Sequence, residues 1–285
     1  MAEKQGTPWT DSEVETVVES YFRMFEAQLT NTPYVKVREN EWVRERTGRS
    51  KGSVERKYQN VSAVLMKLSA GDFVRGYVPL SNYQAKLEPV VEQYLQQHRH
   101  IEAQMLANAE TPVSLRPDFV WNVTEPPKAT TLIAPGQHRA RTAIKTDFVR
   151  LEAYRRDLGK AGELAVVQLE RKRLRQRGQT SLAERVEHVS QTQGDGLGFD
   201  ILSFDQQGDE KYIEVKTTRQ PKQYPFLVTS NELDFSREVP EQFHLYRVFE
   251  LEAPKIGLFE LPGPLDESCA LEPKLYSAVP SAHEE

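Results

Sequence analysis

Hydrophobic positions recur every three or four residues in the first third of the chain, and this spacing predicts helices. The first apolar stripe consists of Val14, Val17, Val18, Tyr21, Phe22 and Phe25, which share one helix face. Thr10 and Glu13 stand at the spacing of a capping box, which indicates that this helix begins next to Thr10. Further helices are expected over about 39–46, 50–68 and 87–107. Residues 8–107 are therefore predicted to form a small all-α domain.

Prolines then interrupt the periodicity. Five of them, Pro112, Pro117, Pro126, Pro127 and Pro135, fall in a stretch that also contains Gly136. Residues 108–148 are therefore interpreted as an interdomain linker, docked in part through Phe119, Val120 and Trp121. At the end of the chain, residues 263–285 mix Pro, Glu and Ser and are expected to form a loosely ordered tail.

Between the linker and the tail, the pattern alternates helix and strand. A long helix is expected over about 147–177, with a break near Gly159. Residues 201–204 and 211–218 read as two strands joined by the polar turn 206–209. A helix beginning near Asn231 and a strand over 244–249 follow. This order indicates an α/β domain over residues 149–262.

Charged side chains stand inside these apolar strands. Asp200 opens the first strand, and Glu214 and Lys216 flank Val215 on the second. Strand alternation puts Glu214 and Lys216 on one face of the sheet. Two carboxylates and a lysine that converge can hold a divalent cation and stabilise developing charge on a phosphate. The pattern thus indicates phosphodiester cleavage, and the alternative is a surface ion pair across a hairpin.

The order Asp200, then Glu214-Val215-Lys216, resembles the PD-(D/E)XK nuclease superfamily, with Phe199 where the motif's proline would stand. The context of this motif consists of residues 159–166, 225–229, 231–233 and 243–248. With that context, residues from about 150 to 260 resemble the C-terminal domain family of protein NO VEIN, which is placed in this superfamily. The resemblance implies a restriction-endonuclease-like α/β domain, a mixed sheet flanked by helices, after the all-α domain.

The resemblance also implies roles for individual residues. Asp200, Glu214 and the backbone carbonyl of Val215 would bind Mg²⁺ or Mn²⁺, and Lys216 would activate the attacking water or neutralise phosphate charge. Glu163 would orient Lys216 or complete a second metal site, unless it stands near a helix start only to favour the helix dipole. Asp195 and Thr217 are weaker candidates.

Basic residues gather in two places although the net charge is −5. The DNA-binding candidates are Arg49, Lys51, Ser53, Arg56 and Lys57 in the N-terminal domain, and Arg171, Lys172 and Arg173 in the C-terminal domain. Helix, glycine-containing turn and basic helix follow the outline of a helix-turn-helix, which would expose the first group. The alternatives are a helical bundle with a basic loop, and solvated helix faces. Residues 48–65 and 76–84 resemble a domain of bacterial restriction-type and HNH-associated proteins.

The remaining features define the expected setting. Cys269 is the single cysteine, and no apolar run approaches the length of a membrane span. A bacterial cytoplasmic protein without a membrane partner is expected. The predicted function is a Mg-dependent endodeoxyribonuclease of restriction or phage defence, with DNA as its partner. Other defence subunits and a homodimer remain open as further partners. The alternatives are a catalytically silent DNA-binding module and a protein-interaction scaffold.

Overall fold

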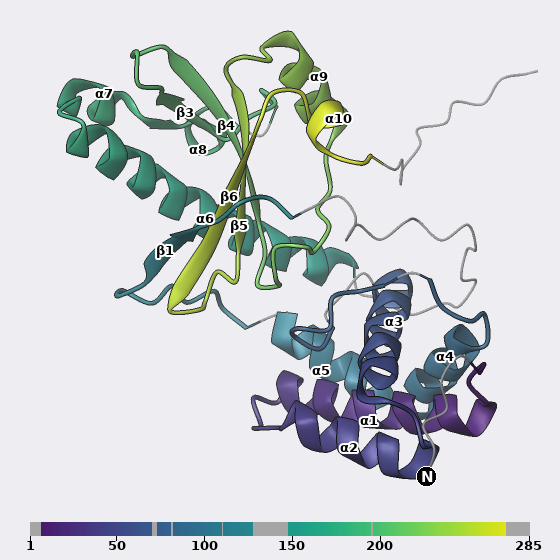
Figure 1. Cartoon of the computed structure of the whole chain (residues 1–285). Coiled ribbons are helices and arrows are strands. Elements are labelled where there is room, and N and C mark those ends of the chain that lie inside the picture. Colours follow the sequence, from purple (N-terminus) through teal and green to yellow (C-terminus); the bar gives the residue numbers. More distant parts are fainter. Residues whose placement is uncertain are drawn as a thin grey trace, which may run out of the picture. The chain divides into compact units, whose positions relative to one another are not determined.

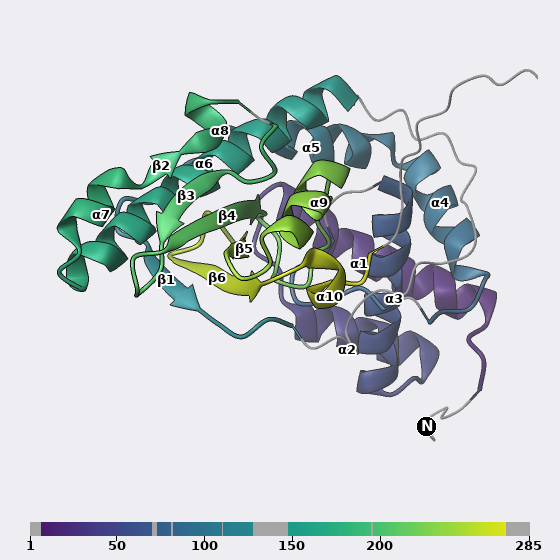
Figure 2. The same ribbon diagram turned by 90° about the horizontal axis from the view of Figure 1, so that it is seen from above.

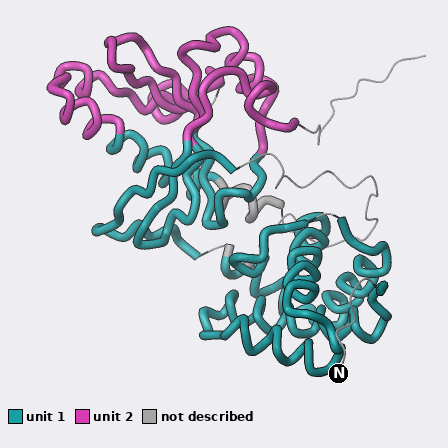
Figure 3. The backbone as a smooth tube through the Cα atoms, viewed as in Figure 1, with its two compact units in different colours: residues 1–169, 215–226, 247–259 teal, residues 170–214, 227–246, 260–285 magenta. Residues whose placement is uncertain are grey.

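The computed structural model describes residues 7–69, 73–80, 82–109, 111–127, 148–194 and 196–271 (Figure 1). The chain forms two compact units (Figure 3): unit 1 comprises 1–169, 215–226 and 247–259, and unit 2 comprises 170–214, 227–246 and 260–285. Each is described by itself. Most of the predicted linker, most of the predicted tail and Asp195 lie outside the described residues. None of the described helices is long and apolar enough to cross a membrane.

The N-terminal region is helical, as predicted. Its helices are α1 (Asp11–Leu29), α2 (Lys36–Thr47), α3 (Lys51–Ser69), α4 (Leu87–Gln97) and α5 (Arg99–Ala109). The capping box of α1 is present, because Thr10 Oγ1 accepts from the Glu13 amide at 3.3 Å and Glu13 Oε2 accepts from the Thr10 amide at 2.9 Å. The helix predicted over 87–107 is instead two helices. His98 leaves the helical region (φ −119°, ψ 58°) and its ring stacks on Tyr94.

One hydrophobic core holds these helices together. The stripe predicted for α1 is buried in full and packs with residues of α3 and α4. Tyr21 lies at its centre, where its hydroxyl contacts Ser62 Oγ at 2.8 Å and accepts from the Val74 amide at 3.0 Å. Burial raises the pKa of Tyr21. These bonds satisfy a polar group that would otherwise be costly inside the core.

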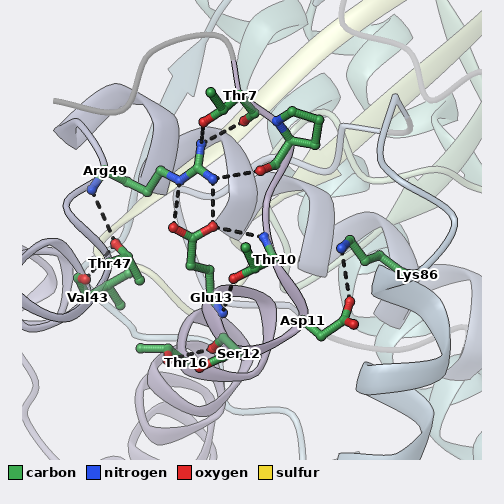
Figure 4. Close-up of polar contacts among 11 residues, drawn as sticks. Thr7, Thr10, Asp11, Ser12, Glu13, Thr16, Val43, Thr47, Arg49 and Lys86 are labelled. Carbon is green, nitrogen blue, oxygen red and sulfur yellow. Dashed lines mark hydrogen bonds and ion pairs between the residues drawn. The ribbon is translucent and has the colours of Figure 1, made fainter.

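A buried ion pair joins α1 to the turn between α2 and α3 (Figure 4). Arg49 Nη2 lies 2.6 Å from Glu13 Oε2, and Nε donates to Glu13 Oε1 at 3.2 Å. Nη1 donates to the Thr7 carbonyl and Nη2 also to the Pro8 carbonyl. Arg49 is only 4% exposed. Gly48 makes the turn possible, since its φ of +68° is disfavoured for residues with a side chain.

Lys57 is buried as well, at 5% exposure, with its ammonium 5.1 Å from the Trp9 ring centre. Burial lowers its pKa to about 8, and the nearby charge of Arg49 adds to that effect. The prediction that Arg49 and Lys57 lie on exposed helical turns is therefore wrong. The sequence shows their charge, but not that Trp9 and Glu13 fold back over them.

The C-terminal region is a mixed sheet flanked by helices, as predicted. Its six strands lie in the order β1-β6-β5-β4-β3-β2 (Figures 1 and 2). They are β1 (Val120–Val123), β2 (Glu187–His188), β3 (Ile201–Phe204), β4 (Glu210–Thr217), β5 (Phe243–Phe249) and β6 (Lys255–Pro262). The helices are α6 (Phe148–Gln176), α7 (Thr180–Arg185), α8 (Val189–Thr192), α9 (Ser230–Glu238) and α10 (Leu265–Ser268).

Two expectations about this region are corrected. Helix α6 runs without a break through Gly159. The missing side chain at Gly162 lets the helix pack closely on Thr217. The segment predicted as linker supplies strand β1, which pairs in parallel with β6 from Val120↔Lys255 to Val123↔Leu258. A strand of four residues between prolines has too few alternations to be identified from its pattern.

The two faces of the sheet carry different layers. On one face, Tyr212 of β4 and Phe243 of β5 contact the ring of Phe235 from α9. On the other face, Tyr246 of β5 bonds to Glu170 of α6. Alternation along β4 consequently assigns its even-numbered residues to the α9 face and its odd-numbered residues to the α6 face.

Arg49→Ala is predicted to lower the free energy of unfolding by about 3 kcal/mol, because it leaves the Glu13 carboxylate buried without its partner. Arg38→Ala, on an exposed position of α2, serves as control and should change it by less than about 0.5 kcal/mol. Urea denaturation followed by circular dichroism measures both. Equal effects of the two substitutions would contradict the buried ion pair as a stabilising contact.

Candidate active site

The β3–β4 hairpin fixes the positions of the two candidate carboxylates. Asp205 closes its turn, since Oδ1 accepts from the amides of residues 207, 208 and 209, each at 2.8 Å. Ile201 pairs with Ile213, and the Asp200 amide donates to the Ile213 carbonyl at 2.9 Å. Asp200, directly before β3, and Glu214, on β4, therefore both adjoin the Ile201–Ile213 pair.

Strand β4 presents Glu214 and Lys216 on the α9 face, as alternation predicted. Glu214 is 4% exposed, whereas Asp200 and Lys216 are half-buried. Val215, between them, points to the α6 face with its side chain buried. The acid, carbonyl and lysine of the motif thus follow one another on one regular strand.

Sequence reasoning missed a second cation on the same face, Arg247. The Tyr212 amide donates to the Gln242 carbonyl and the Thr218 amide to the Val248 carbonyl, both at 2.9 Å. The equal offsets show that β4 and β5 run parallel, a register that places Arg247 beside Lys216. The available signal was a charged residue inside the apolar strand 243–249, the same signal that singled out Glu214.

Arg247 is buried without an acidic partner among the described residues. Its side chain is almost fully enclosed, at 1% exposure. Nη2 donates to the Tyr224 carbonyl at 3.0 Å, and the guanidinium lies 5.2 Å from the Phe226 ring centre. Burial lowers its pKa to about 9. A buried charge held only by a neutral acceptor and a ring is costly, which suggests a role beyond stability.

Glu163 lies close to β4 because its neighbour Gly162 lets helix α6 pack directly on that strand. A Cβ on Gly162 would stand 1.9 Å from Thr217 Oγ1, so α6 touches β4 directly after Lys216. Glu163 is half-buried, with Oε1 3.6 Å from where a side chain on Gly159 would begin. Among the described residues, Thr217 Oγ1 is buried without a hydrogen-bond partner. Thr217 packs against α6 at Gly162, and its candidate role as a ligand stays a prediction.

A chain of polar contacts occupies the α6 face. Glu170 accepts from Ser203 Oγ at 2.7 Å and from the Tyr246 hydroxyl at 3.1 Å. Lys211 Nζ then donates to the Tyr246 hydroxyl at 2.8 Å and to Glu260 Oε1 at 2.6 Å. Although burial raises the pKa of Glu260, bonding to His244 and the charge of Lys211 outweigh it and lower that pKa to about 2. His244 is thus a partner of Glu260.

The predicted DNA-binding residues divide by exposure. Lys51, Arg56 and Lys172 are exposed, and Ser53 is half-buried. Arg171 donates to the Val186 carbonyl at 2.9 Å, and Arg173 lies 2.6 Å from Glu170 Oε2. The last two bind their own domain, so much of the basic charge counted in the sequence is already used inside the fold.

The donor set of the site fits a hard divalent cation. Among the residues that the structure describes, no three His, Cys, Asp or Glu side chains group as a metal centre. The expected ligands are the two carboxylates of Asp200 and Glu214 and, as a third donor, the main-chain carbonyl oxygen of Val215. Oxygen ligands of this kind suit Mg²⁺ or Mn²⁺ rather than zinc.

The fold and these residues define an α/β domain with charged side chains at the ends of its central strands. Residues 162–259 match the family described as Protein NO VEIN, C-terminal. The match includes Glu163, Asp200, Glu214, Lys216 and Arg247 and covers about a third of the chain. No curated protein and no solved structure matches the chain.

Gly162→Ala is predicted to lower the free energy of unfolding by about 1–3 kcal/mol, because the new methyl group overlaps Thr217. The double variant Gly162→Ala, Thr217→Gly removes the obstructing atoms and should unfold at a lower denaturant concentration than wild type but a higher one than Gly162→Ala. Additive losses in the double variant would show that the two residues do not touch.

Arg247→Met is predicted to leave the free energy of unfolding unchanged or to raise it by up to about 2 kcal/mol, because it replaces an unpaired buried charge by an apolar chain of similar length. The same substitution at Arg49, which has a carboxylate partner, should lower it by about 3 kcal/mol. Chemical denaturation compares the two. A large loss at Arg247 would assign that side chain to the stability of the core.

Proposed function

We propose that the C-terminal domain is a metal-dependent endodeoxyribonuclease that hydrolyses phosphodiester bonds of DNA. The observation that carries the proposal is the grouping of Asp200, Glu214 and Lys216 on the central β3–β4 hairpin, with Glu214 and Lys216 on one face of β4, in the part of the chain that matches the NO VEIN C-terminal family. The acid, acid and lysine are the groups that phosphodiester hydrolysis needs. A solvated hairpin has no need of them.

Each residue takes a defined part in this reaction. Asp200, Glu214 and the Val215 carbonyl would hold Mg²⁺ or Mn²⁺, which would supply positive charge to the phosphate and to the attacking water. Lys216 would donate hydrogen bonds to that water or to a phosphate oxygen. Glu163, on α6, would orient Lys216 or complete a second metal site. Arg247, beside Lys216, adds positive charge on the same face as negative charge builds on the phosphate.

The N-terminal domain would select the target through exposed Lys51 and Arg56 and half-buried Ser53, and exposed Lys172 would contact the DNA backbone. The resemblance of this domain to those of bacterial restriction-type proteins supports a role in restriction or phage defence in the bacterial cytoplasm. Further defence subunits and a second copy of the chain are the partners that such a role would involve.

The near-complete burial of Glu214 favours a second candidate, a DNA-binding module that does not cleave. At 4% exposure, this carboxylate presents little surface to a cation in solvent. Both functions place DNA on the same domain, so DNA binding alone does not separate them. Metal-dependent cleavage does.

Purified protein with Mg²⁺ or Mn²⁺ is predicted to cleave plasmid or phage DNA, either modified or unmodified, and chelator should stop the reaction. Glu214→Gln and Lys216→Gln should each lower the rate by about a hundredfold or more, since each removes a charge that acts in the transition state. Arg247→Met should lower it by about tenfold. Glu210→Gln, an exposed position on the same strand, is the matched control and should cleave as wild type does.

Cleavage that survives in Glu214→Gln would place the activity elsewhere or in a contaminant. Absence of cleavage on every substrate, with equal DNA binding by wild type and Glu214→Gln, would favour the non-cleaving module. Absence of both cleavage and DNA binding would leave the interaction scaffold.

A further inference from the structure

Arg247 needs contacts that hold it next to Lys216. The two cations are neighbours on the α9 face, and like charges repel each other most strongly where water is scarce. Arg247 Nη2 donates to the Tyr224 carbonyl at 3.0 Å, and the guanidinium lies 5.2 Å from the Phe226 ring centre. Both contacts come from residues 218–226, the segment that directly follows β4. The position of Arg247 therefore depends on the position of this segment.

An aromatic contact attaches the segment 218–226 to the N-terminal helical region. The ring of Tyr224 stacks on the ring of Phe73, with 6.0 Å between the ring centres and 24° between the ring planes. Phe73, which lies between α3 and α4, is fully buried. Both residues belong to unit 1 (Figure 3). The residue whose carbonyl holds Arg247 thus rests its side chain on the helical region.

Phe73 is itself fixed to helix α1. Its carbonyl accepts from Gln28 Nε2 at 3.0 Å, and Gln28 Oε1 accepts from the Arg75 amide at 2.8 Å. The Val74 amide, between these two contacts, donates to the buried Tyr21 hydroxyl at 3.0 Å. Three successive residues are anchored to one helix, so the backbone that carries the Phe73 ring is well fixed.

A second contact joins the segment 218–226 to the end of helix α5. Arg219 Nη1 donates to the Asn108 carbonyl at 3.2 Å, and Nη2 donates to the Thr111 carbonyl at 2.9 Å. Nη2 also donates to Glu252 Oε1 at 2.9 Å, in the turn between β5 and β6. The segment is consequently attached to the helical region both near its start and near its end.

We propose that Phe73 and Tyr224 are positioning residues of the nuclease site. Through their stacked rings, the helical region keeps the Tyr224 carbonyl where it holds Arg247 beside Lys216. The printed contacts form a continuous chain from α1 to Arg247. The inference rests on the proposed function, because the position of Arg247 affects cleavage only if the C-terminal domain cleaves DNA. On this view the helical region helps to build the site, in addition to any part in selecting DNA.

Phe73→Leu tests the contact, because it removes the ring and keeps an apolar side chain. Phe22→Leu is the matched control, since Phe22 is equally buried in the helical region and its ring stacks on Tyr94 of α4. Tyr224→Leu removes the other ring of the pair, and Tyr224→Phe is the conservative variant that keeps it. Full-length protein is used, at a temperature where every variant is folded.

The first measurement reports on Arg247 without any cleavage. Phenylglyoxal modifies accessible guanidinium groups, and mass spectrometry of the digested protein gives the modification rate of each arginine. Arg247, at 1% exposure, should react slowly in wild type, in Phe22→Leu and in Tyr224→Phe. Phe73→Leu and Tyr224→Leu should raise its rate by about fivefold or more relative to exposed Arg175, because local opening then exposes it.

The second measurement is the rate of DNA cleavage with Mg²⁺. Phe73→Leu and Tyr224→Leu should each lower kcat by up to about tenfold, the loss expected for Arg247→Met, and leave KM within about twofold. In the Arg247→Met background neither substitution should lower kcat further, because losses multiply only when residues act independently. Phe22→Leu and Tyr224→Phe should cleave as wild type does.

Three results would overturn the proposal. The first is an unchanged reactivity of Arg247 in Phe73→Leu and Tyr224→Leu. The second is an equal rise in Phe22→Leu, since a general loosening of the helices would then explain the effect. The third is a loss of kcat that multiplies with the loss in Arg247→Met. If wild type cleaves no DNA, the proposed function fails, and the reactivity of Arg247 still decides whether the helical region holds this side chain.

Discussion

Strand β4 has to carry charge on both faces while it lies in the middle of the sheet. Lys211 points to the α6 face, and Glu214 and Lys216 point to the α9 face. Buried charges are tolerated only with partners, and Lys211 has two, the Tyr246 hydroxyl and the Glu260 carboxylate. These contacts connect β4 to β5 and β6. A slip of one residue would exchange the two faces, so the Lys211 contacts also hold Glu214 and Lys216 in place.

The local features of this protein are readable from its sequence, and the features made by distant contacts are not. The capping box at Thr10, the turn at Asp205 and the alternation around Val215 depend on neighbours within a few residues. The close approach of α6 to β4 depends on Gly162 lying opposite Thr217. Lys216 and Arg247 are neighbours because strands β4 and β5, about thirty residues apart in the sequence, pair in parallel. A single sequence contains no local pattern that predicts the packing of α6 on β4 or the register of β4 with β5.

Charge illustrates the same division. Arg49, Arg171 and Arg173 were predicted to face DNA, but they bind Glu13, the Val186 carbonyl and Glu170. Arginine offers several donors in a planar group, so a folding chain readily uses it to satisfy buried acceptors. A count of basic residues along a helix therefore overstates the charge available to a partner. Lys51, Arg56 and Lys172 remain exposed on the surface.

Strand β1 shows that the folded C-terminal domain begins before the part of the chain that matches a family. It precedes the family match at 162–259 and yet extends the same sheet, by pairing with β6. A fragment cut at the limits of the match would leave one side of β6 with unpaired amides and carbonyls next to its buried residues Ile256 and Leu258. Such open edges recruit strands from other molecules. The segment predicted as a linker thus covers the edge of β6, and its removal would leave that edge free to pair with another copy of the domain.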